Sequence, residues 1–257
     1  MMSSHSVNVA RGMAARSLIL IPRVPSTFYP SLIMPVFLLI TFTGQFSGLT
    51  LLPGFPTDKI INWFVPMTML QGAAFAGVTT GMGVARDLEN GFFDRLLLSP
   101  VPRGGLLAGP LLASVARAGI PIVLLLTIAV IGGAEFLGGL PGVAALVVAC
   151  LGFALAAGAW ALGLALRFKT MQVAPLMQVG IFLTVFLSTA QMPLDLIDGW
   201  LHGVARFNPM TNVLALARQG FLGEVTWAST WPGLVSLLGL CALLVTFAYR
   251  SLQKVTP

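Results

Sequence analysis

Long apolar stretches, separated by short polar ones, make up most of the chain from residue 28 to residue 249. A helix that crosses a membrane needs about 20 mostly apolar residues, and six stretches reach that length. They lie at 28–47, 60–84, 105–132, 143–166, 171–191 and 231–249. The pattern therefore predicts an all-α integral membrane protein with six transmembrane helices.

The stretch at 86–103, RDLENGFFDRLLLSPVPR, stands between the second and third apolar stretches and carries six of the 22 charged residues. A helix over 88–98 would collect leucine and phenylalanine on one half, with Asp94 and Arg95 on the other. The prolines that follow prevent its continuation. The pattern predicts a short amphipathic helix at the membrane surface, whose charged side a soluble partner could bind. Glu89 interrupts the apolar half, so it either pairs with a basic residue or is an acid in the helix's first turn.

The segment before the first span, residues 1–27, contains Arg11, Arg16 and Arg23 beside apolar residues. This mixture predicts an amphipathic segment that lies along the inner membrane surface. We therefore divide the chain into this N-terminal segment and one six-span domain at 28–257.

The region between the fifth and sixth spans is too polar to cross the membrane and too apolar for a free loop. Asn208 and Pro209 form a favourable helix start, because the Asn side chain can accept from first-turn amides and proline loses nothing at the first position. A helix to Leu222 is expected to end at Gly223. Together with helical spacing before Asn208, this predicts two short helices in the outer leaflet.

The distribution of charge predicts the orientation in the membrane. Only 9% of residues are charged, against about 25% in soluble domains, and the mean hydropathy is +0.93. Ten Lys and Arg residues lie at the termini, in 86–103 and in the turn at 167–170, against three on the opposite side. Because basic loops stay inside, both termini are expected to be cytoplasmic. This bias accounts for the net charge of +6 without a nucleic-acid partner.

Several polar residues occur within the predicted spans. Gln71, Gln178 and Gln191 either line a translocation route or hydrogen-bond between helices. Arg117 falls inside the third span, where it faces a substrate route, extends to the inner surface or hydrogen-bonds between helices. Small residues recur at Gly77 and Gly81, which predicts close helix packing within the chain or between copies.

The sequence contains no catalytic or metal-binding pattern. None of its three lysines follows a glycine, so it has no phosphate-binding loop of the G-x-x-x-x-G-K type. His5 and His202 stand alone, without other ligands at metal-binding spacing. We therefore expect that the chain is not an enzyme, binds no cofactor or metal itself, and depends on another polypeptide for energy.

Two stretches resemble a known family: DLENGFFDRLLLSPVPR at 87–103 and FNPMTNVLALARQGFLG at 207–223. With the six-span plan, they make the chain similar to permease subunits of ABC-2 type transporters, and more narrowly to the daunorubicin-resistance-like drug exporters of bacteria. The chain departs from many relatives at Asn90-Gly91-Phe92, where those relatives have Glu or Arg followed by Gly-Thr. The departure bears on local helix capping.

The resemblance implies a homodimer in the bacterial inner membrane, assembled with two copies of a cytoplasmic ATPase that bind ATP and Mg. The stretch 86–103 would be the coupling helix, and its contacts with the ATPase would come from Arg86, Asp87, Glu89, Gly91, Phe92, Asp94, Arg95, Pro100 and Arg103. The cargo would be a hydrophobic, drug-like or antibiotic-like small molecule that passes along the dimer interface among membrane lipids. The resemblance thus implies multidrug efflux and antibiotic resistance.

Other functions fit the same pattern. An exporter of lipid or polysaccharide would have the same architecture. A membrane scaffold that recruits a soluble partner would need only the amphipathic loop. An ion-driven carrier is disfavoured, because such carriers use acidic residues within the membrane and the centres of these spans have none.

Overall fold

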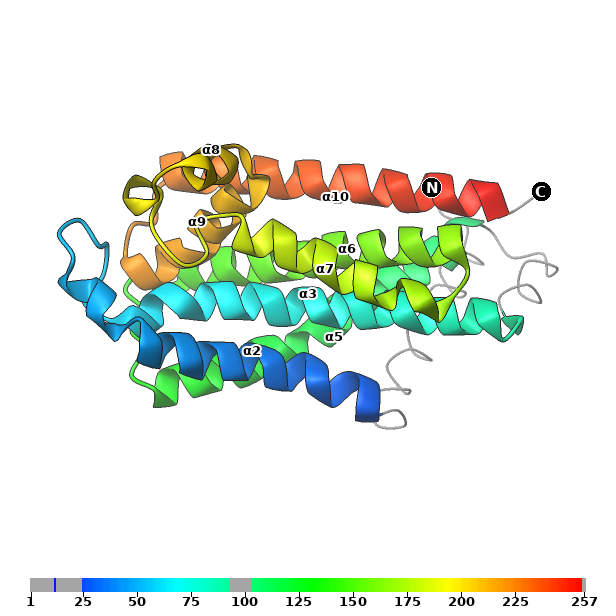
Figure 1. Ribbon diagram of the computed structural model, residues 1–257, viewed down its shortest axis with the longest axis horizontal. Helices are drawn as coiled ribbons and strands as arrows, with labels where there is room; N and C mark the ends of the chain where they lie inside the picture. The colour runs from blue at the N-terminus through cyan, green and yellow to red at the C-terminus, as the bar shows by residue number, and fades with distance from the viewer. Residues whose placement is uncertain (1–11, 13–24, 93–102, 256–257) are drawn as a thin grey trace.

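The computed structural model describes residue 12 and residues 25–92 and 103–255, which form helices and turns without a strand among them. The long helices lie side by side and run in alternating directions, with α7 among them (Figure 1). In chain order, the elements are α2 (Pro25–Gln45), η1 (Ser47–Leu51), α3 (Ile60–Glu89), α5 (Arg103–Ile131), α6 (Gly139–Phe168), η2 (Met171–Val173), α7 (Ala174–Phe186), η3 (Leu194–Leu196), α8 (Trp200–Phe207), α9 (Pro209–Leu222) and α10 (Trp227–Val255).

Three described helices are long and apolar enough to cross a membrane: Gly104–Ile131, Gly139–Phe168 and Trp227–Lys254. The apolar helices at Leu32–Gln45 and Met171–Phe186 are shorter. Helix α3 has 30 residues and lies at the centre of the bundle, where most of its side chains are buried. The membrane-protein character predicted from the hydrophobic pattern therefore agrees with the described helices.

Helices α3 and α6 are in backbone contact. A Cβ atom added at Gly77 would lie 2.5 Å from the carbonyl oxygen of Ala154, and one at Gly81 would lie 2.4 Å from the Cβ of Ala161. Neither distance is possible without moving a backbone, so only glycine fits at these two positions. The small-residue row predicted for packing thus serves packing within the chain.

The short helices α8 and α9 lie at the end of the bundle opposite the C-terminus of α3 (Figure 1). Helix α9 begins at Pro209, where the Asn208 side chain accepts a hydrogen bond from the N–H of Met210 at 2.9 Å, and ends at Gly223 with φ of 80°. It lies against α6, because a Cβ at Gly142 would come within 2.4 Å of the Cα of Gly220.

Helix α3 extends further than the sequence pattern predicts. It continues from the expected end at residue 84 to Glu89, so residues 86–89 form its last turn instead of the beginning of a helix over 88–98. The physical reason is burial: Ala85 and Leu88 lie on the buried side of α3, with Leu88 only 6% exposed. The chain then turns at Gly91, which has φ of 66°.

The fifth predicted span is also shorter in the structure. Helix α7 ends at Phe186, and the residues from 187 to 193 form turns instead of continuing the helix to residue 191. Two groups of predictions lie outside the described residues: those on Asp94, Arg95 and Pro100, and most of the N-terminal segment 1–27.

Substituting alanine at two glycines of α3 should have opposite effects. Gly81→Ala should lower the free energy of unfolding by about 1–3 kcal/mol, because its Cβ forces α3 and α6 apart. Gly83 has open space around its Cβ position, so Gly83→Ala should leave stability unchanged or raise it by up to about 1 kcal/mol. Apparent melting temperatures of the purified chain in detergent measure both. Equal shifts for the two variants would contradict the proposed contact.

Candidate functional site

The carboxylate of Glu89 joins the C-terminus of α3 to the beginning of η2 and α7. Its Oε1 accepts a hydrogen bond from the Thr170 hydroxyl at 2.8 Å and another from the backbone N–H of Met171 at 2.7 Å. The Thr170 hydroxyl in turn accepts from the N–H of Gln172 at 3.2 Å. A negative charge therefore lies at the N-terminus of the next helix, where the first N–H groups have no partner within the helix.

These contacts also determine the protonation of Glu89. The Met171 N–H holds the pKa of this carboxyl below its usual value, and the Thr170 hydroxyl and the nearby Arg86 charge act in the same direction. Desolvation raises the pKa, and its effect is smaller than that of either hydrogen bond. Glu89 is consequently charged at neutral pH, although it stands in the last turn of a helix, where the helix dipole disfavours an acid.

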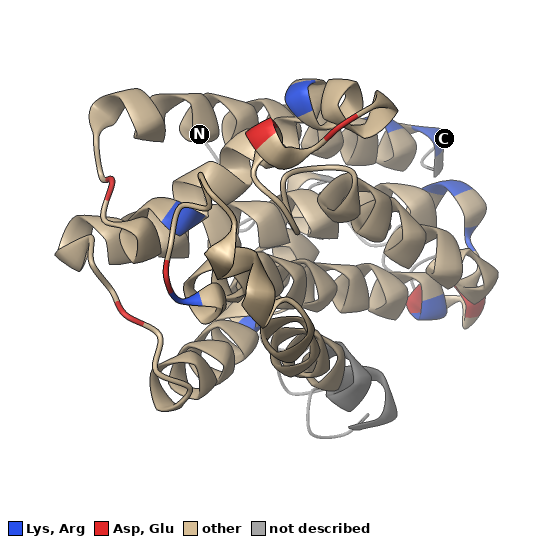
Figure 2. Ribbon diagram, turned by 60° about the vertical axis from the view of Figure 1, so that its left-hand side comes forward, with Lys and Arg blue, Asp and Glu red and all other residues tan. Residues whose placement is uncertain are grey.

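Of the other coupling residues predicted from the sequence, those that the structure describes lie near this end of α3 or at the start of α5. Arg86 and Phe92 are exposed, Asp87 is half-buried, and Arg103 is the first residue of α5. Two basic residues, Arg167 in the last turn of α6 and Lys169 in the turn between α6 and η2, are exposed at the same end. Figure 2 shows that most charged residues lie toward the ends of the bundle, with uncharged helix between.

The four polar residues predicted for the spans do not form one cluster. Gln71 is fully buried on α3, and neither its Oε1 nor its Nε2 has a hydrogen-bond partner among the described residues. Arg117 is buried on α5, whereas Gln178 is exposed on α7. Gln191 lies in the turn after α7, where its carbonyl accepts from the Trp63 indole at 3.1 Å. No hydrogen bond joins any two of the four within the part of the chain that the structure describes.

Arg218 connects three parts of the structure, although the sequence analysis gave it no role beyond its charge. This α9 residue is only 2% exposed. Its Nε donates to the carbonyl of Trp63 at 3.1 Å, and its Nη1 and Nη2 donate to the carbonyls of Thr189 and Ala190, each at 2.6 Å. The guanidinium carbon also lies 3.6 Å from the centroid of the Trp63 ring. The fork of Arg218 thus joins α9 to the start of α3 and to the turn after α7.

One sequence signal could have identified Arg218. It is a charged residue in a helix whose other positions include many that are apolar, and Leu214, Ala217 and Phe221 around it are fully buried. A charge among such residues indicates a buried group with hydrogen-bond partners. Its partners are backbone carbonyls, however, and no sequence pattern marks those.

The loops at the same end are joined by a second set of polar contacts. Lys59 forms a 2.6 Å ion pair with Glu135 and donates to the carbonyl of Gly133 at 3.2 Å. The side chain of Asn62 accepts from the N–H of Glu135 at 3.0 Å. Because the ion pair is exposed, it contributes little free energy, but the three contacts together hold the loop after α5 against the start of α3.

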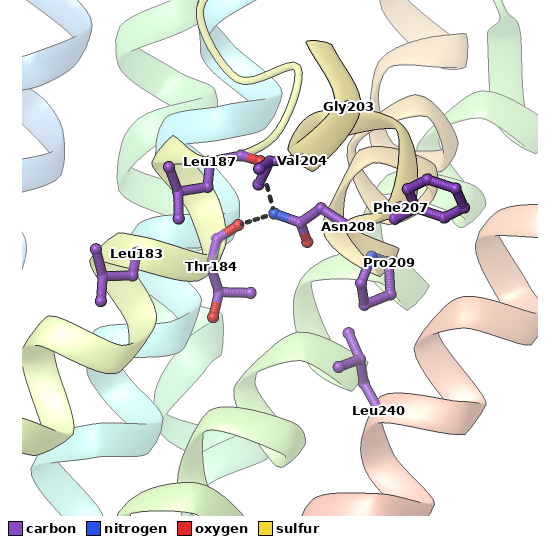
Figure 3. Close-up of a pocket in the computed structure, with 9 residues that line it drawn as sticks. All are labelled: Leu183, Thr184, Leu187, Gly203, Val204, Phe207, Asn208, Pro209 and Leu240. Atoms are coloured by element: carbon purple, nitrogen blue, oxygen red, sulfur yellow. Dashed lines mark hydrogen bonds between the residues drawn. The ribbon is translucent and has the colours of Figure 1, made fainter. Parts of the chain in front are cut away.

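An apolar groove of about 670 Å³ lies between α7, α8 and α10 (Figure 3). The Asn208 side chain lies at this groove and donates to the carbonyls of Thr184 at 2.8 Å and Leu187 at 2.9 Å. Asn208 therefore caps α9 with its oxygen and binds the end of α7 with its nitrogen. The groove is lined by Leu183, Thr184, Leu187, Gly203, Val204, Phe207, Asn208, Pro209 and Leu240.

Comparison with known proteins supports a transport role. The sequence model of the family described as "ABC-2 type transporter" matches residues 10–222, which is most of the chain. The chain is also 25% identical, over 235 residues, to a protein of Pyropia yezoensis named "Putative transport permease ycf38". That alignment covers 88% of this chain and 78% of the relative.

Removing the guanidinium of Arg218 should destabilise the fold strongly. Arg218→Ala leaves the carbonyls of Thr189 and Ala190 without their donor, and we expect a loss of about 2–4 kcal/mol in the free energy of unfolding. Arg218→Lys should recover less than half of it, because an ammonium cannot reach three separate acceptors in the fork geometry. Thermal unfolding in detergent measures the loss. Arg206→Ala, at an exposed arginine of α8, is the matched control and should have little effect.

The Glu89 contact should be insensitive to mild acid. A group whose pKa is lowered by folding contributes stability that is present above its unfolded value, here 4.5, and lost as the pH falls through the lower folded value. The difference in melting temperature between wild type and Glu89→Ala should therefore be equal at about pH 7 and about pH 5.5, and shrink only below about pH 4. A difference that shrinks between pH 7 and 5.5 would contradict this assignment.

Proposed function

This chain belongs to the ABC-2 type transporter family, and from that premise we propose that it is the permease subunit of an ATP-driven exporter of a hydrophobic or amphipathic, drug-like compound. Permeases of this family generally work with a cytoplasmic ABC ATPase. In our proposal, two copies of that ATPase bind ATP and Mg and drive a homodimer of this chain. The observation that carries the proposal is the family match across most of the sequence, together with the polar contacts at both ends of α3.

We further propose that six elements cross the membrane: α2, α3, α5, α6, η2 with α7, and α10. Their alternating directions support this number (Figure 1). Helix α3 is less apolar than a single span requires, but it is enclosed by the other helices, and its polar side chains have partners: Thr68 donates to carbonyls of α3 itself, and Asn62 accepts from the N–H of Glu135 in the loop after α5. A span that does not face lipid can carry such residues.

The charges support an orientation with both termini in the cytoplasm. The end that holds the C-terminus of α3 carries the described basic residues Arg86, Arg167, Lys169, Arg250 and Lys254. The opposite end carries Asp58, Glu135, Asp195, Asp198 and Glu224, with fewer basic residues. Because cytoplasmic loops are rich in Lys and Arg, we place the first end inside. Helices α8 and α9 then lie in the outer leaflet, where the exposed Trp200 and Trp227 suit the interface.

A lipid is the second cargo class that we consider. The groove between α7, α8 and α10 is lined mostly by apolar side chains, and its two polar side chains already donate hydrogen bonds within the chain: the Asn208 amide to Thr184 and Leu187, and the Thr184 hydroxyl to Gly180. An acyl chain needs no hydrogen-bond partner and fits such a lining. Lipid export is therefore the alternative, and a membrane scaffold without transport activity is the outcome if no ATPase binds.

Purification of the tagged full chain from its own host membranes tests the proposal. We expect an ABC ATPase to co-purify and to hydrolyse ATP faster when daunorubicin, as a probe cargo, is added in nanodiscs. Arg86→Glu should reduce the bound ATPase about three- to tenfold, because it reverses an exposed charge at the proposed contact. Arg206→Glu makes the same change at the opposite end and should have no effect. Stimulation by phospholipid and not by daunorubicin would favour the lipid alternative.

Absence of any ATPase, or labelling of the cytoplasmic end from outside the cell, would refute the proposal. For the second measurement, single cysteines at Asn90 and at Asp198 are introduced after Cys150 and Cys241 are replaced by alanine. A membrane-impermeant maleimide added to intact cells should label the cysteine at 198 and leave the one at 90 unlabelled.

A further inference from the structure

We propose that Glu89 is a positioning residue that makes α7 follow the cytoplasmic end of α3, through its hydrogen bonds to Thr170 and Met171. The inference rests on the proposed function, because a displacement of α3 is useful only if a partner drives it. It differs from the role that the sequence predicts for Glu89, which is a direct contact with the ATPase.

Helix α7 is attached to the bundle differently from its neighbours. Only Met177, Ile181 and Val185 are buried among its 13 residues, whereas Leu176, Val179 and Leu183 are exposed. It has no glycine-mediated backbone contact like that of α3 with α6; at Gly180, an added Cβ would meet the ring of Trp160 instead. Side-chain packing alone therefore holds α7 less firmly than α3 and α6.

Polar side chains hold α7 at both ends instead. Glu89 binds the turn that precedes it, while Asn208 and Arg218 bind the carbonyls of its last turn and of the turn that follows. The carboxylate is at the N-terminal end and the guanidinium at the C-terminal end. Both signs match the dipole of α7, so each contact favours the helix in its observed position.

The turn between α6 and α7 is the place where α7 could pivot. Lys169 has φ of 53° and is the one residue other than glycine with positive φ among the described residues. Its N–H closes α6 on the carbonyl of Ala165 at 2.8 Å. Because α6 cannot separate from α3, a change of direction at this turn would move α7 relative to both helices. The two hydrogen bonds of Glu89 span this turn and hold its far side to α3.

The Glu89 carboxylate is therefore already engaged within the chain. Its Oε1 accepts two hydrogen bonds, and the residues that supply them begin the segment leading into α7. A displacement of the last turn of α3, where the exposed Arg86 offers a contact for the ATPase, is passed to the start of α7 by these bonds. Glu89 thus acts through α7, and Arg86 is the better candidate for touching the ATPase.

The test compares three variants of the full chain in nanodiscs with its co-purified ATPase: Glu89→Ala, Glu89→Gln and Thr170→Val. Glutamine keeps an oxygen that accepts both hydrogen bonds but removes the charge, so it separates positioning from an ion pair with the ATPase. The reporter is a cysteine at the exposed Gln178 of α7, in a background without Cys150 and Cys241. Its maleimide labelling rate is measured without nucleotide and after trapping with ATP and vanadate.

We expect the wild-type labelling rate to differ between the two nucleotide states. Glu89→Ala should abolish most of that difference while ATPase binding and ATP hydrolysis remain within about twofold of wild type, because an exposed carboxylate contributes little to the fold. Glu89→Gln should retain at least half of the difference, and Thr170→Val should fall between. Hydrogen exchange of the Met171 amide should accelerate about five- to tenfold in Glu89→Ala and less in Glu89→Gln, because only alanine removes the acceptor.

Three outcomes would overturn the inference while leaving the proposed function intact. Loss of the bound ATPase in both Glu89→Ala and Glu89→Gln would show that Glu89 contacts the ATPase directly. A nucleotide-dependent labelling difference that persists in Glu89→Ala would show that α7 does not depend on Glu89. A wild-type rate that is equal in both states would show that α7 does not move. Failure of the proposed function has a different signature, namely a wild-type chain that binds no ATPase.

Discussion

The backbone contact between α3 and α6 at Gly77 and Gly81 is the constraint on which the rest of the structure depends. Helices in a bilayer gain little from the hydrophobic effect, so close packing and hydrogen bonds must hold them together. Two glycines at a spacing of four allow this closeness. The contact fixes α3 at the centre of the bundle, and Ser114 of α5 packs against the same region through Gly158. With α3 in place, both of its ends become fixed points for the elements around it.

Each end of α3 is joined to another element by a charged side chain. At one end Glu89 supplies a carboxylate to the N–H of Met171; at the other, the carbonyl and ring of Trp63 receive the guanidinium of Arg218. The first N–H groups of a helix and the carbonyls that follow its end lack partners within the helix; Glu89 accepts from one such N–H, that of Met171, and Arg218 donates to two such carbonyls, those of Thr189 and Ala190. Glu89 and Arg218 also contact the segments immediately before and after α7. Helix α7 therefore connects the two ends of the molecule.

A transport permease must change shape without losing its fold. In this structure, one set of contacts suits the preservation of the fold and another set suits the change of shape. Backbone contacts between α3 and α6, and between α6 and α9, leave no room for adjustment. The contacts of α7 with Glu89 and Asn208 are hydrogen bonds at helix ends, which can exchange partners at smaller cost. A movement driven from the cytoplasmic side would therefore act on α7 before it acts on the central pair.

The sequence by itself determined the all-helical membrane character, the approximate positions of the long helices, and the start and end of α9 at Asn208, Pro209 and Gly223. These follow from local properties: apolar run length, the capping geometry of Asn-Pro and the left-handed conformation that glycine adopts. Only the tertiary structure decided that α3 continues to Glu89, because burial of Leu88 against neighbouring helices extends it. It also decided what Glu89 and Arg218 bind, since their partners are backbone groups far along the chain, and a backbone N–H or carbonyl has no residue-specific pattern.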